Sequence, residues 1–360
     1  MALGTPTYSG SESAVGLVRE STWGTTPVTG SDPNKVISGI TFIPIKEESF
    51  DINKNIEPQT DDMVADREIQ RIISNGATVE GGIRFIPGPE SIGYLFTAMF
   101  GTPTTSTLAQ SSGTAEAAYQ HIWNPGLNTR GNWPVPCSIE SLLSGVKSKL
   151  IRGAIIRRLP IDLPNNAVCM VTPDFMAKDI IMLTTASGGT DATSRTLPAK
   201  LTASPTFLGE TEFHWKQLSG FVPEIDSVDQ PGVTSLSFDL AFPGLEGLFT
   251  GGSGMDIGTF RVDNFQLGGR VTMLFEDETM WNKVYNDTHF KLEAKLTGDT
   301  IQGAHKNALT IVAYSCKCAS PGVVNRVGNI EYSFDWTARQ DPTAGKSCLI
   351  TLINTVSTYA

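Results

Sequence analysis

The side chains that most often carry catalysis or bind metals are few in this chain, and they form no known motif. There are four histidines, at positions 121, 214, 289 and 305. They have no HExxH, HxH or Cys/His spacing. A metal site would therefore need ligands brought together from distant segments. No GxSxG elbow, which would present a nucleophilic serine, occurs in the sequence. We expect no catalytic residue, no cofactor and no metal site, so the chain is predicted not to be an enzyme.

Three short segments resemble functional motifs and are better interpreted structurally. Residues 345–347 (Gly-Lys-Ser) match the end of a phosphate-binding loop, but Gln340 stands where that loop needs a glycine, which favours a hairpin turn. Cys316 and Cys318 point to the same side of a strand, and we expect a core-facing pair rather than a redox or metal site. The acidic segment 61–66 could bind a cation, although a solvated loop is the simpler interpretation.

The bulk composition indicates a β-rich chain with an acidic surface. Of the 360 residues, 40% are hydrophobic and only 18% are charged, with 35 glycines and 21 prolines. This length favours two domains, and abundant turn formers favour many short strands. Low charge also suits a protein that hides surface in a polymer. The net charge of −10 and the lack of a dense basic cluster, Arg152, Arg157 and Arg158 being the best candidate, exclude tight DNA binding.

The remaining bulk features concern redox state and location. Five cysteines without a CxxC pair argue against a disulfide framework, so we expect buried free thiols. We expect neither a signal peptide nor a membrane span, because the start lacks an apolar region and no apolar run approaches the length that crosses a bilayer.

Alternating patterns predict strands throughout, with two short helices over 90–100 and 277–285. In the first helix the apolar face is formed by residues 92, 95, 96 and 99, and in the second by 280, 281 and 284, with Asp277 as its cap. The predicted strands are 38–45, 78–86, 119–123, 138–143, 150–159, 167–171, 235–242, within 259–275, 290–296, 308–314, 329–336 and 347–352.

One pattern repeats in the two halves of the chain. A strand with a Gly-Gly pair and a following helix occurs at Gly81-Gly82 and again, about half a chain later, at Gly268-Gly269. This predicts two tandem copies of one β domain. The expected division is an extended arm over 1–35, a first domain over 36–182, a join over 183–232 and a second domain over 233–360.

The order of several segments resembles the tail tube proteins of long, non-contractile-tailed bacteriophages (siphoviruses). The resemblance rests on residues 14–27, with Arg-Glu and Trp-Gly-Thr-Thr-Pro, on 42–49, on 79–101, on the aromatic strand 119–123, and on the ending 334–354. It implies a mainly β fold of two tandem tail-tube-like β-sandwich or barrel domains, each with a short α-helix.

The resemblance also implies a function and partners. Copies of the chain would form stacked rings around a hollow channel, as trimers with pseudo-sixfold symmetry or alternatively as hexamers. The channel would hold a tape measure protein and then, transiently, phage DNA, with tail terminator and distal tail proteins at the tube ends and no membrane contact. The location would be the virion tail, after assembly in the host bacterial cytoplasm.

Candidate residues follow for each surface of such a tube. Strands within 38–52, 77–86, 233–242 and 262–275 are candidates for the lumen wall, and the inward acids would be Glu47, Asp51, Glu80 and Asp239. The arm 1–35 and the excursion 46–76 are candidates for contacts between rings, through Arg19, Trp23, Asp61, Asp62 and Arg67.

Two alternatives remain open from the sequence. One is another β-rich virion component, namely a tail terminator, baseplate or capsid decoration protein. The other, less favoured, is a carbohydrate-binding β protein, in which the tryptophans at 123, 133, 215 and 281 would stack on sugars.

Overall fold

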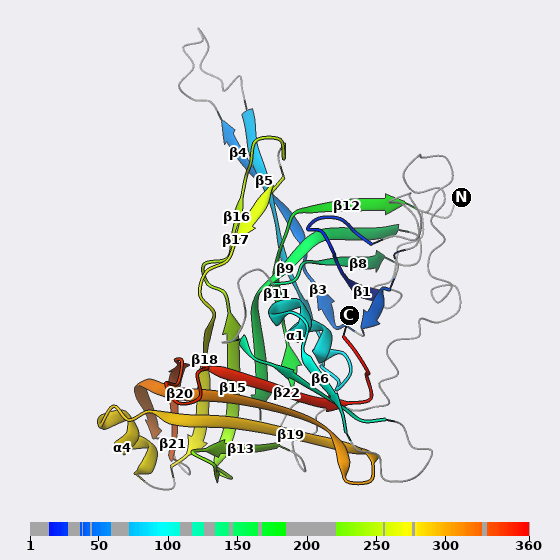
Figure 1. Ribbon diagram of the computed structural model, residues 1–360. Helices are drawn as coiled ribbons and strands as arrows, with labels where there is room; N and C mark the ends of the chain where they lie inside the picture. Colours follow the sequence, from blue (N-terminus) through cyan, green and yellow to red (C-terminus); the bar gives the residue numbers. More distant parts are fainter. Residues whose placement is uncertain are drawn as a thin grey trace, which may run out of the picture.

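The computed structural model is mainly β, as expected, with two short helices among the described residues (Figure 1). It describes residues 14–27, 37, 39–43, 45–58, 72–108, 117–125, 134–143, 147–164, 168–184, 221–254, 256–275, 278–325 and 330–359. The helices are α1 (Ile92–Phe100) and α4 (Thr279–Tyr285). The strands are β1 (Ala14–Arg19), β2 (Thr41–Ile43), β3 (Glu47–Glu48), β4 (Asp51–Pro58), β5 (Ile72–Arg84), β6 (Thr104–Thr107), β7 (Tyr119–Trp123), β8 (Cys137–Leu143), β9 (Lys147–Pro164), β10 (Met170–Val171), β11 (Asp174–Ala177), β12 (Asp179–Thr184), β13 (Phe221–Ile225), β14 (Val228–Asp229), β15 (Val233–Ala241), β16 (Glu246–Leu248), β17 (Thr259–Arg261), β18 (Gln266–Leu274), β19 (Phe290–Gln302), β20 (His305–Asn325), β21 (Ile330–Ala338) and β22 (Cys348–Asn354).

The central element of the fold is an eight-stranded antiparallel sheet, which we call the main sheet. Its order is β4–β5–β11–β9–β15–β18–β21–β20. Strand β9 belongs to the first half of the sequence and β15 to the second, so a ladder of seven residue pairs joins the halves. All four segments predicted to form one wall supply strands to this sheet.

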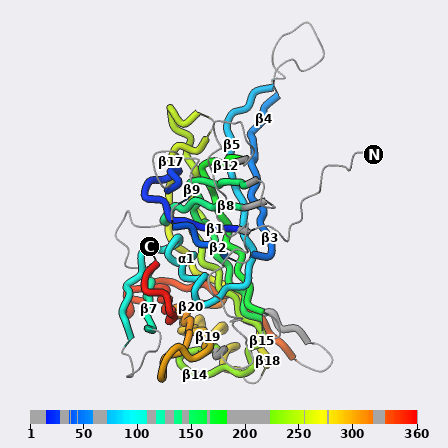
Figure 2. The backbone as a smooth tube through the Cα atoms, turned by 90° about the vertical axis from the view of Figure 1, so that its right-hand side faces the viewer, coloured from blue at the N-terminus to red at the C-terminus, as the bar shows by residue number. Residues whose placement is uncertain are grey.

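Two smaller sheets lie beside the main sheet, and two long strands connect them to it (Figures 1 and 2). One has the order β12–β9–β8–β1–β2 and the other β14–β13–β19–β20–β22–β7–β6. Strands β9 and β20 each pair in two sheets, one through their first part and another through their second part. Each half of the chain is thus a layered β structure.

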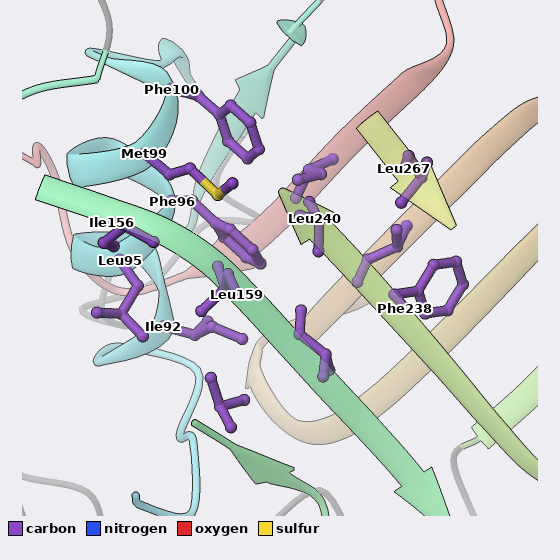
Figure 3. Close-up of a cluster of buried hydrophobic side chains, with 14 of the residues drawn as sticks. Ile92, Leu95, Phe96, Met99, Phe100, Ile156, Leu159, Phe238, Leu240 and Leu267 are labelled. Atoms are coloured by element: carbon purple, nitrogen blue, oxygen red, sulfur yellow. The ribbon is translucent and has the colours of Figure 1, made fainter. Parts of the chain in front are cut away.

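The buried core lies between these layers. Helix α1 packs against β9, and its residues Ile92, Leu95, Phe96 and Met99 are all buried, as the periodicity predicts (Figure 3). The second helix differs from the prediction, because Met280 is its one buried residue and Trp281 is 43% exposed. Its seven residues form two turns that lie at the surface, where Met280 alone reaches the core. The proposed cap at Asp277 lies outside the described residues.

The pairing registers show that the halves repeat one topology. In the first half Asp51 is opposite Glu80, and in the second half Asp239 is opposite Gly268. Gly81 and Gly269 are likewise equivalent, and they lie opposite Phe175 and Trp336. The first glycine of one pair therefore matches the second glycine of the other, a shift of one position from the direct alignment of the two Gly-Gly pairs.

Irregularities of the backbone repeat as well. Strand β9 has a left-handed residue at Gly153 (φ 63°), and β20 has its counterpart at Ser315 (φ 48°). Both positions adjoin a register shift in the ladders β8–β9 and β19–β20. A further register shift separates β9 from β11 near Arg157, and its counterpart separates β20 from β21 after Cys318. Bulges at matching places favour duplication over coincidence.

Strands lie inside two segments that were predicted to be an arm and a join between domains. Residues 14–19 of the predicted arm form β1, which pairs with β8 and β2, and β13 and β14 lie inside the predicted join 183–232. A deletion designed to remove only an arm therefore has to end before Ala14. The division into 1–35, 36–182, 183–232 and 233–360 stays a prediction.

Candidate assembly surfaces

One face of the main sheet packs on the core, and the other carries charged pairs; we call the second the polar face. In β9 the residues 159, 161 and 163 are buried, while Arg158 and Asp162 are exposed. A bulge at Arg157 breaks this alternation, because Asp174 of β11 is opposite Arg158 and the next residue, Phe175, is opposite Ile156. The extra residue brings two consecutive arginines to the polar face.

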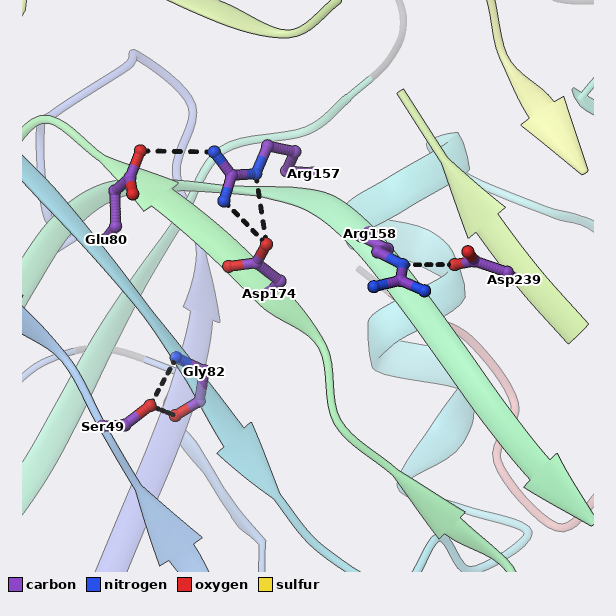
Figure 4. A network of polar contacts seen from close by, with 7 residues as sticks. All are labelled: Ser49, Glu80, Gly82, Arg157, Arg158, Asp174 and Asp239. Atoms are coloured by element: carbon purple, nitrogen blue, oxygen red, sulfur yellow. Dashed lines mark hydrogen bonds and ion pairs between the residues drawn. The ribbon is translucent and has the colours of Figure 1, made fainter. Parts of the chain in front are cut away.

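Acidic side chains of three neighbouring strands pair with these arginines (Figure 4). Arg157 donates to the Asp174 carboxylate at 2.9 and 3.1 Å and to Glu80 Oε1 at 3.2 Å. Arg158 Nε donates to Asp239 Oδ1 at 2.7 Å, and this bond raises the pKa of the Arg158 guanidinium. Arg152, the third arginine of the best basic cluster of the sequence, pairs with Asp179, so the whole cluster is neutralised.

The same face continues into the second half. Arg270 of β18 and Asp335 of β21 are directly opposite each other and form a two-bond ion pair, at 2.7 and 3.2 Å. The hydrogen bond from Arg270 holds the pKa of Asp335 below its ordinary value. Together with Arg158 and Asp239, these residues line one shallow surface hollow. The polar face thus presents alternating, paired charges over several strands.

The four acids predicted to face a lumen all lie on the polar face. Asp51 is directly opposite Glu80 in the ladder between β4 and β5. Glu47 is opposite Arg84 in the ladder between β3 and β5. Glu47, Asp51 and Glu80 are exposed, and Asp239 is half-buried. The structure brings Glu80 and Asp239 into the arginine network, whereas the Asp51 carboxylate accepts a bond from the neighbouring Ile52 amide.

The main sheet ends in two strand edges. Among the described residues β4 pairs only with β5, and β20 beyond Cys316 pairs only with β21. Just before β4 the Phe50 amide donates to Glu48 and the Phe50 carbonyl accepts from Lys149 at 2.9 Å, so side chains hold this end of the edge in place. Unpaired strand edges are templates for pairing with another chain.

The hairpin β4–β5 projects beyond the body of the chain (Figures 1 and 2). Every residue of β4 is exposed, and Ile52, Ile56 and Ile72 lie on the face that continues the core face of Val79. The hairpin β16–β17 is its counterpart in the second half, and its Phe249 lies close to Gly76. Exposed isoleucines on a projecting hairpin form an apolar surface available to a partner.

The predicted contacts between rings fall in three places. Arg19 is exposed at the end of β1 and donates to Thr102 at 3.1 Å. Trp23 is partly buried inside the chain, where its indole N–H donates to the Gly153 carbonyl at 2.9 Å and its ring packs edge-on against Phe260. The remaining candidates, Asp61, Asp62 and Arg67, lie outside the described residues.

The polar residues that looked chemically active have structural roles. His121 is buried, contacts the Thr105 hydroxyl and the Val356 carbonyl at 2.8 Å each, and has its pKa lowered by burial. Cys316 is buried, and Cys318 packs against the same core, as predicted. All five cysteines are free thiols.

Two other kinds of site have no candidate in the part of the chain that the structure describes. No group of three or more His, Cys, Asp or Glu side chains could hold a metal ion there. The described helices include none that is long and apolar enough to cross a membrane. The acidic segment 61–66 is not among the described residues.

The sugar-stacking alternative loses one of its tryptophans. Trp123 is 2% exposed, and its indole N–H donates to the Gly101 carbonyl at 3.2 Å, so its ring faces the core. Trp281 is exposed, while Trp133 and Trp215 lie outside the described residues.

Two short repeats that mark the polar face were missed from the sequence. Ser-Phe-Asp occurs at 49–51, at 237–239 and at 333–335. In the first two copies the serine Oγ accepts a bond from the next strand, from Gly82 N at 3.1 Å and from Arg270 N at 3.0 Å. Asp-aromatic-x-Ala occurs at 174–177 and 335–338. Both motifs stand at equivalent register positions, and the identical letters were the signal that could have found them.

The comparisons with known proteins agree with this geometry. No curated protein is similar enough to the chain to count as a match. The family described as phage tail tube protein matches residues 10–338, which is most of the chain and reaches from before β1 to the end of β21. The chain therefore belongs to the phage tail tube protein family.

Proposed function

We propose that copies of this chain assemble into rings, and that the rings stack into the hollow tube of a long, non-contractile phage tail. Membership of the family makes the chain a structural tail tube protein of a bacteriophage virion. The observation that carries the finer proposal is the main sheet, an open antiparallel sheet with a polar face and two edges. Edges of this kind close into a ring when each chain pairs with the next.

The repeat supports three chains per ring. Each chain supplies two copies of one β unit and eight strands to the main sheet. Three chains would give a barrel of 24 strands with pseudo-sixfold symmetry. With strands about 4.8 Å apart and tilted by about 40°, such a barrel is about 50 Å across between Cα atoms. Barrels of this size enclose an aqueous channel rather than a packed core.

The charges of the polar face suit the wall of a DNA channel. Arg157, Arg158 and Arg270 are each held by a carboxylate, so these three arginines offer no free cation to phosphate. Asp51 and Glu47 add exposed negative charge to the same face. A net-acidic wall whose arginines are mostly paired with carboxylates repels DNA and lets it pass without sticking. The channel would hold the tape measure protein before it carries DNA.

The projecting hairpin β4–β5 is the surface that we propose for contact between rings. Its exposed isoleucines, Ile52, Ile56 and Ile72, would be covered by an adjacent ring, and the segment that joins its two strands carries Asp61, Asp62 and Arg67. Tail terminator and distal tail proteins would cover the same surfaces at the two tube ends. Assembly would take place in the host cytoplasm.

Electron microscopy of the purified chain tests this function. We expect concentrated protein to polymerise into hollow tubes of constant width. Protein that stays monomeric at every concentration and salt condition would contradict the proposal. Particles seen as single rings, or as knobs on capsids when mixed with phage heads, would favour a tail terminator or a capsid decoration protein instead.

A further inference from the structure

The ladder between β9 and β15 is a junction between two repeat units inside one chain. It pairs residues 158–164 with residues 235–241 in antiparallel register, from Arg158 opposite Ala241 to Pro164 opposite Ser235. The Phe242 amide donates to the Arg157 carbonyl at 2.9 Å and extends the ladder by one bond. This junction shows how the β9 edge of one unit receives the first strand of the next unit.

The two edges of the main sheet are the equivalents of these two strands. Strand β20 corresponds to β9, with Ser315 matching Gly153, and the segment β3–β4 corresponds to β15, with Asp51 matching Asp239. The counterparts of 158–163 are therefore 320–325, and those of 236–241 are 48–53. Both segments are unpaired on the outer side in the described part of the chain, so the second unit has the same receiving edge but no following strand within its own chain.

We propose that β20 of one chain pairs with β4 of a second copy, in the register of the β9–β15 junction. By this correspondence, Asn53 of one chain is opposite Ser320 of the neighbouring chain. Asp51 is likewise opposite Gly322, and Ser49 is opposite Val324. The proposal rests on the proposed function, since it describes how the ring closes. It goes further by fixing the partner strand, its direction and its register.

Backbone directions in β4 agree with this pairing. The Ser49 amide donates to the Gly82 carbonyl in β5, so odd-numbered residues of this segment bond to β5 and even-numbered ones face the open edge. In the equivalent strand β15, Phe242 is an even-numbered residue that bonds to β9. The Phe50 carbonyl, which accepts from Lys149, keeps a second lone pair for a neighbouring amide.

The junction between chains differs chemically from the junction within a chain. Arg158 is replaced by Ser320 in the equivalent position, whereas Asp239 is matched by Asp51. The ion pair of the internal junction therefore has no counterpart at the junction between chains. The Asp51 carboxylate there adds negative charge to the polar face. Pro321 has no N–H, so the ladder between chains lacks that bond, which is tolerated in an edge strand. The Phe50 amide donates to the Glu48 carboxylate at 3.2 Å, so this side chain has to turn away before that amide can join the ladder.

Disulfide trapping in assembled tubes tests the register. Asn53 and Ser320 form a non-hydrogen-bonded pair in this register, where Cα atoms are about 4.5 Å apart and a disulfide can form. The test variant is Asn53→Cys with Ser320→Cys. The slipped control, Asn53→Cys with Val324→Cys, moves one cysteine four positions along the strand, about 13 Å. The internal control is Arg158→Cys with Ala241→Cys, the matching pair within one chain.

After oxidation, the test variant should convert most of the monomer band into larger bands on a non-reducing gel, and reduction should reverse this. The slipped control should stay monomeric, and the internal control should form its disulfide without a change in mass. Normal tubes that cross-link through the slipped pair, or through neither pair, would overturn the proposed register while leaving the tube function standing. Failure of every variant and of the unmodified chain to form tubes would overturn both.

Discussion

The closest approach between strands of the main sheet gives the sharpest test of the fold. At Gly269 in β18 an added Cβ would lie 1.9 Å from the Ser237 carbonyl oxygen of β15, whereas ordinary contacts begin near 3.4 Å. The carbonyl belongs to the backbone and cannot rotate away. Substitution by alanine must therefore push β15 and β18 about 1.5 Å apart, where the Ser237 hydroxyl also accepts from the Arg270 amide.

The cost of Gly269→Ala follows from this separation. Two cross-strand hydrogen bonds beside the site would be weakened or lost at about 1 kcal/mol each. Overpacking in a packed interior adds about 1 kcal/mol or more. We expect a loss of about 3 kcal/mol in the free energy of unfolding, enough to lower the urea midpoint clearly.

Equilibrium urea unfolding, followed by tryptophan fluorescence, measures this loss. The matched variant is Gly81→Ala in the first repeat, where the added Cβ would lie 2.5 Å from the Phe50 Cα, so a similar loss is expected. The control is Gly251→Ala, whose Cβ has nothing within 4 Å. If Gly269→Ala were as stable as Gly251→Ala, the close approach of the strands would be wrong.

Three further predictions concern charge and thiol chemistry. A double-mutant cycle of Arg158→Ala and Asp239→Ala should give a coupling of about 0.2–1 kcal/mol that falls at high salt, because both side chains are partly exposed; a coupling of zero at low salt would contradict the pair. The depressed pKa of Asp335 means that its pairing with Arg270 stabilises the fold fully above the ordinary carboxyl pKa near ~4, and that this contribution is lost as the pH falls through the folded-state pKa. Asp335→Asn should therefore remove part of the acid dependence of the urea midpoint, and an unchanged dependence would refute this. Partial burial raises the pKa of the Cys318 thiol to about 12, so this thiol should react with a thiol reagent at neutral pH far more slowly in the native chain than in the unfolded chain, and equal rates at Cys318 would contradict its packing against the core.

Local patterns predicted part of the elements of this fold and missed others, among them β1, β4, β11 and β12. The aromatic strand 119–123 and the helix ending at Phe100 were predicted because their side-chain periods are strong and their ends are marked by turn residues. The second helix was located correctly, but its apolar face was overestimated at Trp281. Whether a side chain reaches the core depends on where the helix lies, and periodicity does not contain that information.

The candidate surfaces were only partly predictable, for two physical reasons. The bulge at Arg157 interrupts the period-two alternation, so no local pattern indicated that two adjacent arginines share a face. The pairing of β9 with β15 joins residues far apart in the sequence, which depends on the topology of the whole sheet. Pairing also explains why Glu80 and Asp239 belong to one network, although they were selected singly from the sequence.

The repeat was detected from glycines, but its register needed the structure. Gly81 and Gly269 are equivalent because each lets its strand approach the backbone of the strand beside it. Aligning the two Gly-Gly pairs directly shifts the match by one residue and turns every side chain to the other face. The Ser-Phe-Asp copies at 49–51 and 237–239, whose serine hydroxyls accept from Gly82 N and Arg270 N, fix the correct register.

The most direct test of the account is the rotational symmetry of the assembled tube. Averaged cross-sections of tubes from the purified chain should show a hollow ring with six lobes in two alternating kinds, hence three chains per ring, because each chain contributes two non-identical repeats joined by β9 and β15. Strict sixfold symmetry, with one whole chain in each lobe, would contradict the central claim that two repeats of one chain stand side by side in the wall.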